Sequence, residues 1–144
     1  MQREIELAIG QGERCFLDSD DLMDLRDLLE HVKTSDVLLL FQTKSVLQRP
    51  WCLLELLEAK RRGVPVVPVM ITGIADRAFD LPKMRRLVAD LEQELPARNP
   101  SALQLLHEHL GDDLSELQRV ITGVIDAADA TTAVHWNPGA GDNE

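Results

Sequence analysis

Two residues that could do chemistry stand four positions apart in the segment PWCLLELLEAKRR, where Trp51 precedes Glu55. Leucines flank Glu55 on both sides, and a carboxylate in apolar surroundings is costly unless a partner or a function offsets the cost. Residues four apart on a helix are neighbours, so the indole would lie one turn from the carboxylate. The pair predicts either a ligand site at the start of a helix or two residues with only a structural role. In the latter, Trp51 anchors the core and Glu55 is the polar edge of a buried helix, paired with Arg49 or Lys44.

A second charged group is the acidic turn FLDSDDL at 16–22. Asp18 and Asp20 resemble the magnesium-binding pair of haloacid-dehalogenase-like phosphatases, but the small residues that follow the pair in that family are absent here. An EF-hand loop starting at Asp18 would need a glycine and a bidentate carboxylate where this chain has Met23 and Leu29. Helix capping accounts for the aspartates, because Asp accepts hydrogen bonds from the free N–H groups of a first turn. We expect no metal site, and phosphatase chemistry is the outside alternative.

Composition narrows the classes of function. The 25 acidic and 15 basic residues give a formal net charge of -10, which repels phosphate backbones and anionic lipid surfaces. Aromatic residues make up 3% and Tyr is absent, so there is little material for base stacking. The longest apolar run, 37–41, is far shorter than the roughly 20 residues that a membrane helix needs. Cys15 and Cys52 form no CxxC pair, which favours buried structural thiols. We therefore expect a cytoplasmic protein with no nucleic-acid or membrane partner.

The spacing of apolar residues predicts strands that alternate with helices. Strands are expected at 15–17, 37–41, 66–70 and 131–136, and helices at 22–32, 51–62, 81–95, 103–110 and 114–128. Such alternation implies a parallel sheet with right-handed crossovers, whose ligands bind beyond the carboxyl ends of the strands. The unbroken apolar run at 37–41 predicts a central strand that is buried on both faces. Pro68 predicts one unpaired side of its strand, because proline donates no ladder hydrogen bond.

The stretch SDVLLLFQTKSVLQRPWCLLEL at 35–56 resembles the middle of a TIR domain. The shared pattern is a strand preceded by Ser-Asp, a short loop, and a helix that opens with Trp-Cys and carries Glu four residues after the Trp. CFLD, PVVPVM and AVHWNP resemble the second, fourth and fifth strands of that family. The likeness covers residues 14–71 well, whereas the helical stretch 79–128 is longer than usual. Gln42 replaces the usual Ser, and the chain is expected to begin inside the first helix, after the family's first strand.

The resemblance implies a TIR-type, flavodoxin-like α/β fold with flanking helices and a helix-rich C-terminal part, forming one domain over 1–138 with a tail at 139–144. Many TIR domains cleave NAD+ between nicotinamide and ribose, and the carry-over places the catalytic carboxylate at Glu55. A carboxylate beside the ribose stabilises an oxocarbenium-like transition state. Trp51 would wall the pocket, while Lys44 and Arg49 would meet the pyrophosphate or remain solvated loop charges. NAD+ would be the substrate, and no cofactor is expected.

The same resemblance leaves a non-catalytic role open, because other TIR domains act as scaffolds that assemble signalling complexes. That role implies self-association or binding to other TIR domains in signal transduction. Without the family's first strand the sheet would keep exposed edges, which favour association between chains. Fold alone does not decide between enzyme and scaffold.

Overall fold

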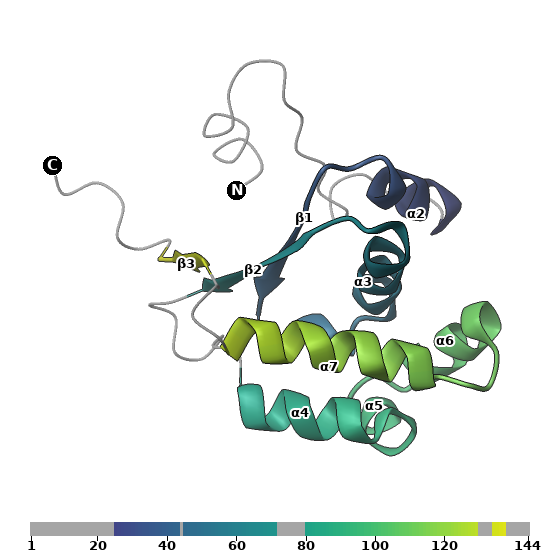
Figure 1. The fold of residues 1–144 in the computed structure, drawn as a ribbon. Coiled ribbons are helices and arrows are strands. Elements are labelled where there is room, and N and C mark those ends of the chain that lie inside the picture. Colours follow the sequence, from purple (N-terminus) through teal and green to yellow (C-terminus); the bar gives the residue numbers. More distant parts are fainter. Residues whose placement is uncertain (1–24, 44, 72–79, 130–133, 138–144) are drawn as a thin grey trace, which may run out of the picture.

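The computed structural model describes residues 25–43, 45–71, 80–129 and 134–137, which form a small parallel sheet and six α-helices (Figure 1). This arrangement belongs to the α/β class that the sequence predicts. The expected strand at 15–17 and the acidic turn lie outside the described residues. In chain order the elements are α2 (Leu25–Lys33), β1 (Leu38–Gln42), the 3-10 helix η1 (Val46–Gln48), α3 (Pro50–Arg62), β2 (Val66–Ile71), α4 (Leu81–Ala89), α5 (Leu91–Arg98), α6 (Ala102–Leu110), α7 (Ser115–Asp129) and β3 (Val134–Trp136).

The described sheet has the order β1-β2-β3, and both pairings are parallel. The register of β1 on β2 runs from Leu38 opposite Val66 to Gln42 opposite Met70, so two of the strands expected from the sequence pair directly in the parallel direction that it predicts. The ladder between β2 and β3 begins at Val69, one residue after Pro68. The residues before Val134 lie outside the described part of the chain, so the unpaired side of Pro68 stays a prediction. Strand β2, and not β1, has a neighbour on each side in this sheet.

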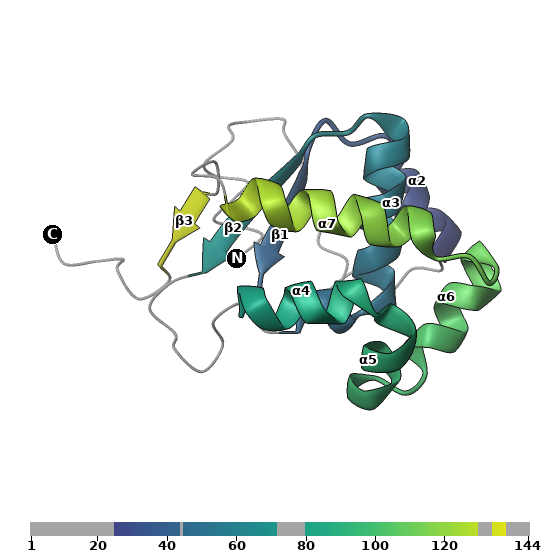
Figure 2. The ribbon, with the colours of Figure 1, turned by 60° about the horizontal axis from the view of Figure 1, so that its bottom comes forward.

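The helices cover one face of the sheet, which we call the inner face. Leu38 and Leu40 of β1 point into the leucine-rich core formed with the helices. The crossovers from β1 to β2 and from β2 to β3 run in the same direction across the sheet, so the right-handed rule places both on one face. Figures 1 and 2 show α3, α4 and α7 gathered on that side.

The expectation that the run 37–41 is buried on both faces is wrong for the described part of the chain. Val37 is 43% exposed, and Leu39 and Phe41 are only half-buried. These three residues share the face of β1 that points away from the helices, because side chains alternate along a strand. An unbroken apolar run predicts burial on both faces only where helices cover both, and the described helices cover one.

Helix α3 is the central support of the core. It begins at Pro50, whose fixed φ suits a first helical turn, and ends at Gly63 in the left-handed conformation with φ of 71°. Its fully buried leucines include Leu53 and Leu56, which pack with apolar residues of α4, α5, α6 and α7. Helix α3 contacts α2, α6 and α7, so the helical layer is built around it.

The C-terminal half contains four helices where the sequence predicts three. The apolar stripe expected to form one helix over 81–95 is divided at Asp90. The Asp90 side chain accepts a hydrogen bond from the backbone N–H of Gln93 and so begins α5, just as Asp80 accepts one from Lys83 to begin α4. Apolar periodicity continues through such a break, which is why it was not visible in the pattern. Among the described residues, no helix is long and apolar enough to cross a membrane.

Candidate functional site

Apolar side chains of the loop between β1 and α3 anchor this loop to the core. Val46 and Leu47 of η1 are buried in the same core as Leu40 of the strand. The side-chain amide of Asn99 donates a hydrogen bond of 3.0 Å to the backbone oxygen of Gln48, which joins this loop to the C-terminal end of α5. The start of α3 is thereby fixed close to the carboxyl end of β1, where parallel α/β sheets place their ligands.

Glu55 is the one buried charged residue among those described, with 8% of its surface exposed. It lies in the second turn of α3. Trp51, Glu58 and Arg62 form the solvent-facing stripe of this helix, whereas Cys52 and Ala59 lie on a covered side. At 100° per residue Glu55 falls between these two sides. The expectation that Glu55 sits at the polar edge of a buried helix agrees with this placement.

Gln42, the last residue of β1, is the second buried polar side chain of the described chain. It is 1% exposed, and it shares the inner face with Leu40 two positions earlier. Neither Nε2 nor Oε1 of its amide has a hydrogen-bond partner among the described residues. A buried amide without partners costs free energy, so this position calls for an explanation beyond packing. The sequence singled Gln42 out only as a departure from the TIR pattern and did not place it in the site.

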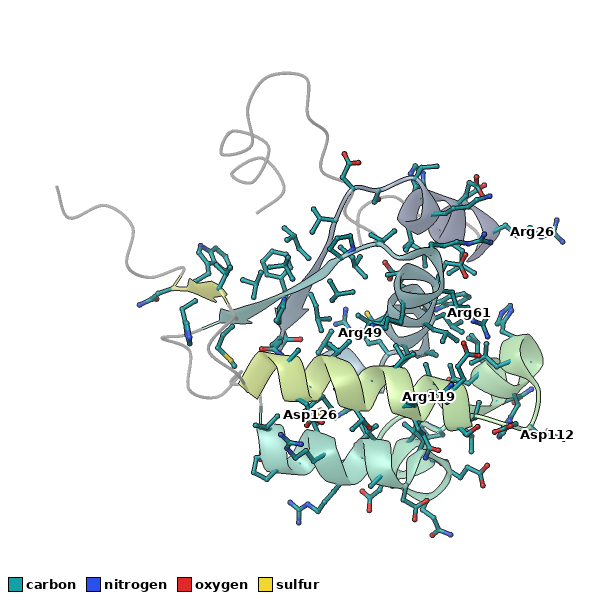
Figure 3. The ribbon with its side chains drawn as sticks, viewed as in Figure 1. Arg26, Arg49, Arg61, Asp112, Arg119 and Asp126 are labelled. Atoms are coloured by element: carbon teal, nitrogen blue, oxygen red, sulfur yellow. The ribbon has the colours of Figure 1, made fainter. Side chains whose placement is uncertain are left out.

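The other predicted site residues that the structure describes, Trp51 and Arg49, are exposed, whereas Gln42 and Glu55 are buried. Trp51 is 39% exposed, and its ring lies 6.2 Å from the ring of His109 on α6, measured between ring centres. The alternative that Trp51 anchors the core is therefore wrong. Arg49 precedes the first turn of α3 in an extended conformation and is exposed (Figure 3). Lys44 lies outside the described residues.

A shallow hollow beside α3 lies between this helix, α2 and α6. Its lining includes Leu54, Leu57, Glu58, Arg61 and His109, and Glu55 is not part of it. Trp51 does not line it either, so this hollow is not the pocket that the sequence predicts around Glu55 and Trp51.

An ion pair fixes the far end of α3 to the start of α7. Nη2 and Nε of Arg61 donate hydrogen bonds of 2.6 and 3.0 Å to the two carboxylate oxygens of Glu116. These hydrogen bonds raise the pKa of Arg61 and lower the pKa of Glu116. The two-point geometry defines the orientation of α3 more closely than a single contact would. Arg49 precedes the first turn of this helix, whereas Arg61 lies in its last turn.

No cluster of three or more His, Cys, Asp or Glu side chains able to hold a metal ion occurs in the described part of the chain. Asp18 and Asp20 lie outside it. Cys52 is half-buried and packs against the core, in agreement with the structural role expected for it.

Comparison with known protein-family models, with curated proteins and with solved structures found no match to this chain. The TIR resemblance therefore remains a prediction from the residues.

Proposed function

We propose that the chain is a TIR-like signalling domain that cleaves NAD+ at the bond between nicotinamide and ribose, with Glu55 as the catalytic carboxylate. The observation that carries the proposal is the burial of Glu55 in the helix that follows β1, because buried titratable residues cluster at functional sites. In this role the carboxylate faces the ribose and stabilises positive charge as the glycosidic bond breaks. Trp51, Arg49 and Lys44 serve as the substrate-binding residues of the proposal.

The arrangement of β1 and α3 supports this choice over a purely solvated carboxylate. A parallel strand leads through a short loop into the helix that carries Glu55, which is the unit in which α/β folds build ligand sites. A carboxylate shielded from water interacts more strongly with a developing cation than an exposed one, because the local dielectric is lower. The proposed NAD+ hydrolase needs no metal or cofactor, and its setting is the cytoplasm.

Nicotinamide release from NAD+ tests the proposal. We expect the parent protein to release nicotinamide and Glu55→Gln to abolish the release. Gln is the better replacement because Glu55 is buried, and removing its whole side chain would also leave a cavity. Glu58→Gln is the matched control, since Glu58 lies on the same helix and pairs with Arg62. Turnover that survives Glu55→Gln in folded protein would contradict the assignment.

A non-catalytic assembly module is the second candidate, and the exposure of Trp51 favours it. Exposed Trp residues are enriched at the energetic centres of protein interfaces. In this role the chain associates with itself or with other TIR domains. Absence of nicotinamide release at every protein concentration, together with concentration-dependent association in light scattering, would select the assembly role. A strict monomer in light scattering would contradict it.

A further inference from the structure

The face of the sheet that points away from the helices is apolar. We call it the outer face and define it by Leu39, Phe41, Val67, Val69, Val134 and Trp136. The ring centres of Phe41 and Trp136 are 6.2 Å apart in an edge-to-face arrangement that spans β2, so these side chains form one continuous surface. Val134 is 52% exposed, Val69 in the middle of the face is buried, and the other four side chains are half-buried. A continuous apolar surface of this kind marks an interaction site.

The crossover helices cannot cover the outer face, because both right-handed crossovers lie on the inner face. Helix α2 is also on the inner side, since it packs against α3. The occupant must therefore come from another part of the chain or from another molecule. Residues 137–144 contain no large apolar side chain, and the same holds for 130–133. Residues 72–79 are tied at both ends, to β2 and to α4.

The chain before α2 is the remaining source of apolar residues. Residues 4–17, which we call the N-terminal segment, include Ile5, Leu7, Ile9, Phe16 and Leu17. A right-handed crossover through α2 would place a preceding strand at the free edge of β1. A strand at 15–17 would then bring the residues before it within reach of the outer face. A second copy is the alternative occupant, and it would make protection of this face depend on protein concentration.

We propose that the N-terminal segment of the same chain docks on the outer face of the sheet, with Ile9 and Phe16 among its anchoring side chains. The segment thereby supplies the second apolar layer that the described helices do not. This inference is independent of the proposed catalytic role.

Tryptophan fluorescence of the full chain tests the docking. The chain has two tryptophans, so Trp51→Phe leaves Trp136 as a single reporter on the outer face. We expect Trp136 to resist acrylamide quenching to the same extent at all protein concentrations. Ile9→Asp or Phe16→Asp should raise its quenching, because a carboxylate on an apolar contact shifts docking toward the open state by at least about tenfold. Gln11→Asp is the matched control, with the same added charge and no apolar loss.

Two outcomes of this experiment would overturn the proposal. One is easy quenching of Trp136 in the otherwise unchanged chain, and the other is protection that develops only as the protein dimerises, which would assign the face to a second copy. The Trp136→Phe chain, in which Trp51 reports from α3, reveals whether the Asp variants unfold the helical layer. If they do, hydrogen exchange of the chain without substitutions decides: protected amides in residues 4–17 support docking, and full exchange there overturns it.

Discussion

Replacing Gln42 with Met should stabilise the fold, because the buried amide has no hydrogen-bond partner among the described residues. A buried unsatisfied polar group costs about 1–3 kcal/mol, and Met fills nearly the same space without a polar atom. We count this free-energy cost once, because burial removes the nitrogen and the oxygen of the same amide from water together. For a chain of this length the expected rise in the melting temperature is roughly 3–10 °C.

Thermal unfolding followed by circular dichroism measures this change. Leu40→Met is the matched control, because Leu40 is buried on the same face of the same strand two residues earlier. A volume-conserving swap there should cost less than about 1.5 kcal/mol and bring no gain. A melting temperature that falls in Gln42→Met as much as in Leu40→Met, or more, would refute the reasoning. It would mean that the amide makes a stabilising hydrogen bond.

The remaining predictions concern substitutions in the helices, and each is measured as a change in melting temperature. The hydrogen bond from Arg61 lowers the pKa of Glu116, so the pair stabilises the fold above the ordinary carboxyl pKa, and this contribution is lost as the pH falls through the lowered value. Glu116→Gln should therefore destabilise slightly at pH 7, with a smaller effect as the pH falls toward and below the lowered pKa, whereas Glu92→Gln should not show this pattern. Gly63→Ala should cost about 1 kcal/mol, because Gly63 has a φ of 71°. Gly123→Ala should instead gain about 1 kcal/mol, because Gly123 is exposed inside α7 with nothing within 4 Å of an added Cβ. A change in melting temperature of the same sign in both variants would contradict the positions of Gly63 at the end of α3 and Gly123 inside α7.

Local signals predicted the elements well where the chain carries them explicitly. Pro50 and Gly63 mark the two ends of α3, and the observed helix begins and ends there. The break at Asp90 escaped prediction, since the apolar stripe continues on both sides and only the capping hydrogen bond divides it.

Properties set by the whole topology were harder to predict. An unbroken run such as the one at 37–41 looks the same whether one face or both are covered. The number of covered faces depends on the direction of the crossovers, which is decided by strand order and not by the run. The environment of Trp51 escaped prediction for the same reason, because its neighbour His109 belongs to a helix about sixty positions further along the chain.

The two buried polar residues of the described chain are Gln42, at the end of β1, and Glu55, in α3, and η1 lies between these two elements in the chain. Elsewhere the buried side chains of this part are apolar, so the usual agreement between polarity and exposure fails only at these two residues of the described chain. Natural sequences tolerate such exceptions chiefly where function requires them, because each one lowers stability. Combining Gln42→Met with the nicotinamide assay separates the possibilities. A variant that gains stability and loses turnover would assign the amide to the substrate, whereas a gain in stability with turnover unchanged would make it a packing fault beside a working carboxylate.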